Sequence, residues 1–148
     1  MHVFHSETVR ATPRDGVHPP EVDVQAVGLS TTLALPESLG GVPRERTSNP
    51  EQLFGGAYAG CMVFAIEHAA RTVPSNLNGL SCTAVVRIGR GKDRANHLEV
   101  DLDVHLPAME QPEAEALAQA ATRLCPFHQA IEGNVDATFR VHGAPPAS

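Results

Sequence analysis

The stretch Leu53-Phe-Gly-Gly-Ala-Tyr-Ala-Gly-Cys-Met-Val-Phe-Ala-Ile66 decides the fold, because its 14 residues carry no charge. A helix on a protein surface needs one polar face, and this stretch has none. We therefore expect a helix at the centre of the domain that is buried nearly all round. Three glycines would let neighbouring backbone approach it closely: Gly55, Gly56 and Gly60.

The residues on either side of this stretch predict where the helix begins and ends. Asn49 can cap the free backbone donors, Pro50 fits the first helical position, and Glu51 complements the positive end of the helix dipole. Pro74 cannot continue a helix. The helix is therefore expected to run from Pro50 to about Val73.

Alternating apolar and polar residues predict strands before and after this helix. The first forty residues alternate in this way around an Asp-Gly turn at Asp15–Gly16, and residues 36–47 have the composition of a loop. After the helix, the pattern predicts an antiparallel hairpin from Leu80–Ile88 and Leu98–Leu106, with the second strand exposed on one face.

The last third of the sequence predicts two helices and one strand. Pro112 opens a helix, Pro126 interrupts it, and a short helix then runs through Ile131. The final strand is expected around Ala137–Val141. Strands, helix, hairpin, helices and strand in this order define an α+β domain.

Length and composition are those of a globular protein with one core. The 148 residues are 42% hydrophobic and 19% charged, so residues 1–148 are expected to form a single domain. A net charge of −6 disfavours nucleic acid and anionic membrane surfaces as partners. Because the sequence has neither a bilayer-spanning apolar run nor a signal-peptide pattern, we expect a cytoplasmic location.

Three cysteines are too few for a disulfide scaffold and leave reactive or core thiols as the alternatives. Cys61 lies in the middle of the uncharged helix, where a small core residue is the simpler interpretation. Cys125 precedes Pro126 and is expected to cap the short helix, whose donors would stabilise a thiolate. From helix electrostatics alone Cys125 is the better nucleophile, and Cys61 becomes reactive only if a cation reaches it. Cys82 is assigned to the core.

Eight histidines raise the question of a metal site. The fragment Cys125-Pro-Phe-His128 supplies two ligands, but no second pair with metal-ligand spacing accompanies it. We therefore expect neither a metal nor another cofactor.

Two long stretches stand in a characteristic order: Asn49-Pro-Glu-Gln-Leu-Phe-Gly-Gly-Ala-Tyr-Ala-Gly-Cys61, and later Cys125-Pro-Phe-His-Gln-Ala-Ile-Glu-Gly-Asn134. Together with Arg14-Asp-Gly16 and Leu35-Pro-Glu-Ser-Leu-Gly-Gly41, they resemble the organic hydroperoxide resistance branch of the OsmC/Ohr family over nearly the whole chain. The resemblance implies antiparallel sheets around a buried central helix. It also implies an intertwined homodimer with two active sites at the subunit interface.

The resemblance further implies roles for four residues. Cys61 would attack the peroxide as a thiolate and Cys125 would resolve the product, while Arg14 would hold the thiolate and Glu51 would orient Arg14. The implied reaction reduces an organic hydroperoxide to an alcohol through a Cys61 sulfenic acid and a Cys61–Cys125 disulfide. Dihydrolipoamide or a lipoylated protein would then supply the dithiol that reduces the disulfide. The guanidinium would provide the positive charge that the helix dipole does not.

The spacing of Glu51 and Cys61 raises a separate geometric question. Ten residues along a straight helix correspond to about 15 Å, farther than one arginine comfortably bridges. Our hypothesis is that Glu51 reaches the Arg14 beside Cys61 from the partner subunit, or that the helix bends at Gly55-Gly56. The alternative role for Glu51 is only to complement the helix dipole.

Three residues depart from the family pattern. Arg44 and Arg46 lie in a loop that is more charged than the glycine-rich loop usual in the family, so each competes with Arg14 as the cation for the thiolate. His128 stands where a small polar residue is usual, and we expect it to alter the reactivity of Cys125.

Four aromatic residues lie near the two candidate thiols in sequence or on the helix. Phe54 and Tyr58 fall near the helix face of Cys61, and Phe64 and Phe127 are close in sequence to the thiols. Apolar walls of this kind would suit alkyl or fatty-acid hydroperoxides better than hydrogen peroxide. The alternative is that all four are core residues.

The sequence thus predicts an organic hydroperoxide reductase that needs no metal, flavin or haem. Two alternatives stay open. One is a peroxidase of the sister OsmC branch. The other is a non-catalytic dimeric thiol module that senses redox state or binds metal.

Overall fold

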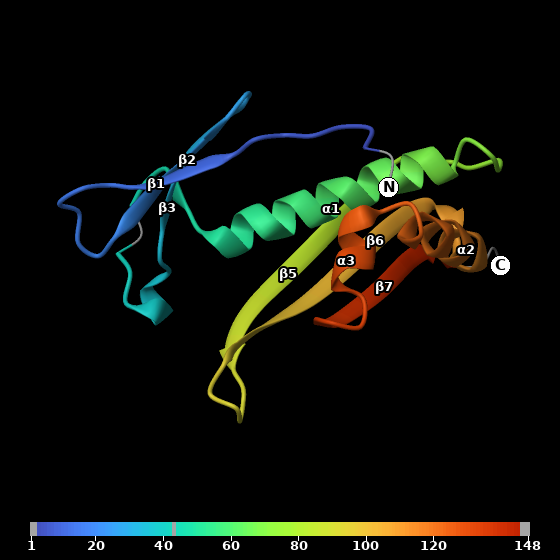
Figure 1. Cartoon of the computed structure of the whole chain (residues 1–148). Helices are drawn as coiled ribbons and strands as arrows, with labels where there is room; N and C mark the ends of the chain where they lie inside the picture. Colours follow the sequence, from blue (N-terminus) through green and yellow to red (C-terminus); the bar gives the residue numbers. More distant parts are fainter. Residues whose placement is uncertain (1–2, 43, 146–148) are drawn as a thin grey trace. The chain divides into compact units, whose positions relative to one another are not determined.

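The computed structural model describes residues 3–42 and 44–145. The chain divides into two compact units, Met1–Leu53 and Phe54–Ser148 (Figure 1). That residues 1–148 form a single domain stays a prediction.

The N-terminal unit is built on a small sheet with the strand order β1-β2-β3-β4. Its strands are β1 (Arg10–Pro13), β2 (Glu21–Ala26), β3 (Leu29–Ala34) and β4 (Thr47–Ser48). The first three pair antiparallel, as the alternation predicts, and β4 pairs parallel to β3. The expected loop therefore ends in a short strand, and it also contains a 3-10 turn at Glu37–Leu39.

The predicted turn between the first two strands is confirmed. Gly16 adopts a φ of +71°, a left-handed conformation that glycine adopts without steric penalty. The backbone N–H of Arg14 donates to the carbonyl of Glu21 at 2.9 Å and closes the connection.

The uncharged stretch forms helix α1, Pro50–Ala69, with the predicted cap at its start. The backbone N–H of Gln52 donates to Asn49 Oδ1 at 2.8 Å, and Gln52 Oε1 accepts from the N–H of Asn49 at 3.1 Å. These reciprocal bonds satisfy two donors that the helix itself leaves free.

Helix α1 ends at Ala69, four residues before the predicted end at Val73. The N–H of Thr72 donates to the carbonyl of Ala69 at 3.3 Å, and its hydroxyl donates to the same carbonyl at 3.0 Å. Because side-chain hydrogen bonds of this kind compete with the helical pattern, the chain turns before Pro74 is reached.

The expectation that α1 is buried nearly all round does not hold for the single chain. Phe64 is 73% exposed, and a Cβ at Gly56 or Gly60 would meet no atom within 4 Å. Only Gly55 permits a close approach, since a Cβ there would lie 3.2 Å from Val86 Cγ2. The single chain covers one face of the helix, so burial of the opposite face stays a prediction tied to the homodimer. The covered face consists of Gly55, Tyr58, Met62, Ala65, Ile66 and Ala69.

The C-terminal unit contains a second sheet, in the order β5-β6-β7, and two further helices. Strands β5 (Ser81–Arg90) and β6 (Asn96–Glu110) form the predicted antiparallel hairpin. Strand β7 (Asp136–Ala144) pairs parallel to β6, so the expectation of antiparallel sheets is wrong here. Helices α2 (Gln111–Thr122) and α3 (Pro126–Ile131) follow β6 and precede β7 in the sequence, and they form the long connection that parallel pairing requires (Figure 1).

The core of this unit lies between β6 and the covered face of α1. Alternate residues of β6 are buried, whereas those between them, such as Asp101 and Asp103, are partly exposed, as the sequence predicts. Burying side chains of this size stabilises the fold by about 1.5–3 kcal/mol each. The buried residues of the strand are Val100, Leu102, Val104, Leu106 and Met109.

Within residues 3–42 and 44–145, no helix has both the length and the apolar character that crossing a bilayer requires.

Candidate active site

The two cysteines that the sequence singles out lie side by side in the C-terminal unit. Cys61, on α1, and Cys125, at the start of α3, have their Sγ atoms 3.1 Å apart, with Cys125 as hydrogen-bond donor. Both thiols are free. A disulfide has an S–S length of about 2.05 Å, so closing the bond requires a movement of about 1 Å.

Cys125 caps α3 as predicted, but it does not have the acidity that a capping position alone would confer. The backbone N–H of His128 donates to Cys125 Sγ at 3.5 Å, which favours the thiolate. Burial acts in the opposite direction and is the larger effect. Together with the hydrogen bond to Cys61, it raises the pKa of Cys125 to about 11. Packing around Cys125 therefore outweighs the effect of the helix end, which the expectation from helix electrostatics alone had not included.

Cys61 is the more accessible of the two thiols. It is half-buried, whereas Cys125 has no exposed surface. Cys61 lines a cavity of about 520 Å³ together with Phe64, Leu124 and Phe127. A small organic molecule in this cavity would meet the sulfur of Cys61 between apolar side chains.

Of the four aromatic residues near the thiols, two line the cavity and two are core residues. Phe64 and Phe127 line the cavity at Cys61, as the prediction of apolar walls requires. Phe54 and Tyr58 belong instead to the core cluster, Tyr58 with only 1% of its surface exposed.

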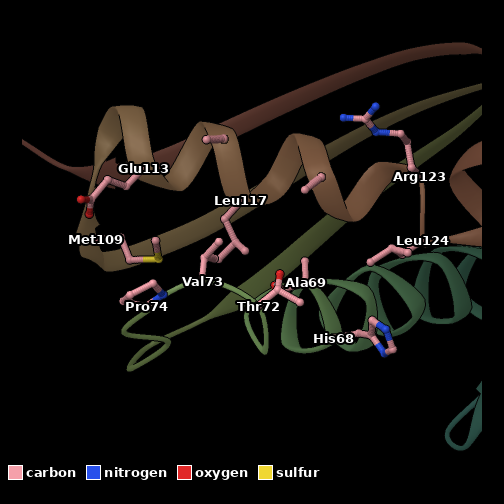
Figure 2. A pocket seen from close by; sticks show the side chains of 12 residues that line it. His68, Ala69, Thr72, Val73, Pro74, Met109, Glu113, Leu117, Arg123 and Leu124 are labelled. Atoms are coloured by element: carbon pink, nitrogen blue, oxygen red, sulfur yellow. The ribbon is translucent and has the colours of Figure 1, made fainter.

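A larger hollow of about 730 Å³ lies between the C-terminal part of α1 and helix α2 (Figure 2). It shares His68 and Leu124 with the cavity at Cys61, so the two hollows adjoin. Its walls are mostly apolar, with the charged side chains of Glu113 and Arg123 also on its lining. In the single chain, apolar surface therefore extends well beyond the sulfur of Cys61.

Cys82 is confirmed as a core residue. It lies on β5 opposite Val104 and packs against the buried cluster. Burial raises the pKa of its thiol to about 11, so it stays protonated at neutral pH.

The sequence analysis missed a second polar contact between the two helices that carry the thiols. The hydroxyl of Tyr58 lies 2.7 Å from His128 Nδ1. Burial lowers the pKa of His128 and raises that of Tyr58, so both side chains are neutral near neutral pH. One signal was available in the sequence: Tyr58 precedes Cys61 by three residues, and His128 follows Cys125 by three.

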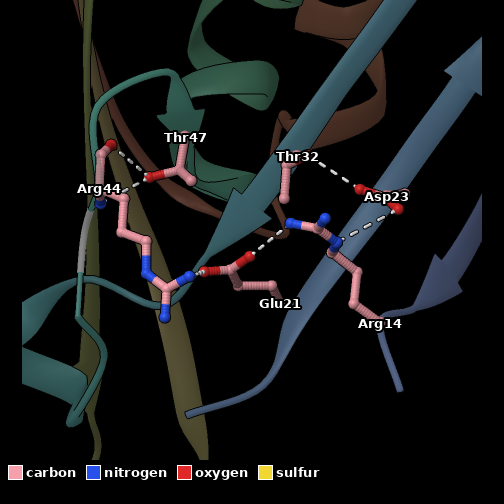
Figure 3. Close-up of polar contacts among 6 residues, drawn as sticks. All are labelled: Arg14, Glu21, Asp23, Thr32, Arg44 and Thr47. Carbon is pink, nitrogen blue, oxygen red and sulfur yellow. Dashed lines mark hydrogen bonds and ion pairs between the residues drawn. The ribbon is translucent and has the colours of Figure 1, made fainter. Parts of the chain in front are cut away.

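Arg14 lies in the N-terminal unit, in an ion-pair network around the buried Glu21 (Figure 3). Its Nη1 atom lies 2.9 Å from Glu21 Oε2, and its Nε atom lies 3.6 Å from Asp23 Oδ2. Arg44 approaches the other oxygen of Glu21 at 3.4 Å. At the centre of this network is Glu21, a buried acidic residue that is only 3% exposed. The sequence alone did not single it out. The action of Arg14, Arg44 or Arg46 on Cys61 stays a prediction.

Glu51 lies in the first turn of α1, as predicted. Its Oε2 atom is buried and has no hydrogen-bond partner among the described residues. A buried carboxylate oxygen ordinarily has a donor, so this atom calls for a partner beyond those contacts. Both hypotheses for Glu51, a reach across subunits and a bend of the helix, remain predictions.

Among the residues that the structure describes, no group of three or more His, Cys, Asp or Glu side chains is arranged to hold a metal ion.

Taken together, the fold and the adjoining sulfurs define a small α+β protein with a dithiol site. Residues 44–140 match the profile of the family described as OsmC-like protein. The organic hydroperoxide resistance protein of Xanthomonas axonopodis pv. citri is 34% identical over 112 residues, which cover 75% of this chain and 78% of that protein. The chain belongs to the OsmC-like family.

Two further relatives agree with this assignment. The organic hydroperoxide resistance protein OhrA of Bacillus subtilis is 31% identical over 121 residues, covering 79% of this chain and 86% of that protein. A crystal structure of an organic hydroperoxide resistance protein OsmC from Legionella pneumophila is 34% identical and superimposes with a TM-score of 0.80. That match covers 95% of this chain and 99% of the other, which confirms the predicted α+β fold.

Proposed function

We propose that the protein reduces organic hydroperoxides to alcohols, with Cys61 as the attacking sulfur and Cys125 as the resolving thiol. One observation carries the proposal: Cys61 faces an apolar cavity and lies 3.1 Å from the wholly buried Cys125. The relatives named organic hydroperoxide resistance protein support the same reaction class.

The chemistry begins with the hydrogen bond between the two sulfurs. The raised pKa of Cys125 keeps its proton in place, so its thiol donates to Cys61 and stabilises negative charge there. The Cys61 thiolate attacks one oxygen of the hydroperoxide and breaks the O–O bond. The released alkoxide takes a proton and leaves as the alcohol, and Cys61 becomes a sulfenic acid.

The second half of the cycle uses Cys125. Its sulfur attacks the Cys61 sulfenic acid, water leaves, and the Cys61–Cys125 disulfide forms. A dithiol then reduces this disulfide by exchange and is itself oxidised to a cyclic disulfide. We assign that role to dihydrolipoamide or a lipoylated protein in the cytoplasm, acting on a homodimer.

Arg14 is the proposed source of positive charge for the thiolate and the departing alkoxide, with Glu51 as its positioning partner. The buried, unpaired Oε2 of Glu51 supports this assignment, because such an atom requires a donor. Arg44 shares the carboxylate of Glu21 with Arg14, so Arg44→Gln is the matched control for Arg14→Gln. Loss of activity in Arg14→Gln alone would identify Arg14 as the functional cation.

The proposed substrates are hydroperoxides with an alkyl or acyl chain. The apolar walls at Cys61 and the adjoining hollow along α2, which Figure 2 shows, would bury such a chain, whereas hydrogen peroxide gains nothing from them.

The test measures consumption of cumene hydroperoxide with dihydrolipoamide present in excess. Wild-type protein is expected to turn over many equivalents, and Cys61→Ser is expected to lose at least about a hundredfold in rate because the nucleophile is gone. Cys125→Ser should accumulate a sulfenic acid that dimedone traps, and Cys82→Ser serves as the thiol control. Oxidation only once per wild-type chain, or normal turnover in Cys61→Ser, would overturn the proposal.

A further inference from the structure

Helices α1 and α3 are joined by two polar contacts, one helical turn apart. Cys61 meets Cys125 with 3.1 Å between the sulfurs, and Tyr58 meets His128 with 2.7 Å between Oη and Nδ1. On each helix the members are three residues apart, a spacing that places both on the same face. The Tyr58–His128 contact therefore lies directly beside the thiol pair.

The environment of Tyr58 makes this contact necessary. Its side chain is buried, and His128 is the side chain that meets its hydroxyl. Removing a hydroxyl from water without a hydrogen bond is unfavourable, so the tyrosine stabilises the arrangement that keeps His128 in place. The imidazole of His128 also rests edge-on against Phe139 of β7, with ring centroids 5.4 Å apart.

Helix α3 has few other anchors. It contains six residues, and Ile131 is the one residue within it that is buried. Phe127 is 41% exposed, and Leu124, just before the helix, is 46% exposed. A polar contact at His128 is therefore a substantial part of what holds the first turn of α3, and with it the sulfur of Cys125, against α1.

We propose that Tyr58 and His128 are positioning residues that hold the thiol of Cys125 at bonding distance from Cys61. The hydrogen bond of these two side chains joins them to each other and not to either sulfur. Their hydrogen bond limits the movement of α3 and raises the effective concentration of one thiol at the other. The step it assists is the loss of water between the Cys61 sulfenic acid and the Cys125 thiol, which forms the S–S bond. For this step the inference rests on the proposed function.

The equilibrium between the dithiol and the disulfide tests the inference without any hydroperoxide. Full-length protein is equilibrated with mixtures of reduced and oxidised glutathione, and the fraction of Cys61–Cys125 disulfide is measured by mass spectrometry. Tyr58→Phe removes only the hydroxyl oxygen. It is expected to lower the effective concentration of the thiol pair about three- to tenfold, the range that corresponds to one net hydrogen bond.

Substitutions of His128 separate positioning from general damage to the fold. His128→Phe should match Tyr58→Phe, and the double variant should be no worse than either, because both remove the same contact. His128→Asn carries a polar atom at the place of Nδ1, so its dithiol–disulfide equilibrium should equal that of wild type. His128→Gln places its amide farther along the side chain and should not.

Rapid-mixing kinetics complete the test. In Tyr58→Phe, once the Cys61 sulfenic acid has formed, its conversion to the disulfide should be about three- to tenfold slower than in wild type. Equal equilibria and equal conversion rates in wild type and Tyr58→Phe would overturn the inference, whatever the activity. A protein inert to hydroperoxides but with the shifted equilibrium would instead overturn the proposed function and leave the positioning role standing.

Discussion

The two units of the chain each bury polar side chains, but they provide different kinds of partner. The N-terminal unit uses ion pairs, and the C-terminal unit uses hydrogen bonds between neutral groups. In the N-terminal unit, the carboxylate of Glu21 is 3% exposed and meets the guanidinium groups of Arg14 and Arg44 (Figure 3). In the C-terminal unit, Tyr58 and Cys125 are buried without a charged partner and instead bond to His128 and Cys61.

The difference follows from what each group becomes at neutral pH. Burying a carboxylate is unfavourable unless cations offset its loss of hydration, and the N-terminal unit places two beside Glu21. The thiol and the phenol can stay neutral, and burial raises the pKa of each, so one hydrogen bond satisfies them. In the proposed reaction, negative charge that develops on a sulfur therefore has to be met by a group brought to it.

The largest effect is expected where a charge is already buried. Glu21→Gln keeps the size of the side chain but removes the charge from both ion pairs, and it should lower the free energy of unfolding by about 2 kcal/mol. The arginines are half-exposed and regain water, which limits the loss. Urea unfolding measures the change, with Asp23→Asn as the more exposed control. A change no larger than that of the control would mean that the ion pairs contribute little.

A smaller effect is expected when alkaline pH forces charge onto a buried thiol. The pKa of Cys82 is about 11 in the folded chain, above its ordinary value of 9.0. Its contribution to stability is therefore complete below pH 9 and is lost as the pH rises through the folded pKa. Between pH 7 and pH 10, wild type should lose roughly 1 kcal/mol more than Cys82→Ala in unfolding experiments under reducing conditions. Parallel pH profiles for the two proteins would show that burial of Cys82 does not resist ionisation.

The smallest effect is expected for charges on the exposed face of the second sheet. The hydrogen bond from Arg87, at 2.9 Å, is the main cause of the lowered pKa of Asp101. Its contribution is present above the unfolded pKa and is lost as the pH falls through the folded value. Arg87→Gln should raise the pKa of Asp101 in an NMR titration while leaving the melting temperature at pH 7 unchanged within error. A clear fall in melting temperature would show that solvent screens this pair less than its exposure indicates.

Much of the fold could be predicted because its signals are local. Asn49 caps α1 through its own neighbour Gln52, and Cys125 caps α3 because Pro126 follows it. The alternation of apolar and polar residues predicted β5 and β6, since one face of a strand pair must be apolar when it covers a core. The two cysteines of the candidate site were identified together through motifs that span the regions around both.

The features that were missed depend on residues distant in sequence. The parallel pairing of β7 with β6 has no local signal, because it depends on how α2 and α3 return the chain. Likewise, the sequence pattern around Glu21 is that of an ordinary strand residue. Only the structure shows that Arg14 and Arg44 each contact one of its carboxylate oxygens.

The amino-acid sequence alone determined where the helices begin, which strands alternate, and which two cysteines form the candidate pair, because capping, periodicity and motif spacing act over a few residues. Only the tertiary structure decided which sulfur is open to an apolar cavity and which stays protonated. That distinction depends on burial, and burial depends on every segment packed around the atom. The same packing brings Tyr58 to His128 and the thiol of Cys125 to Cys61.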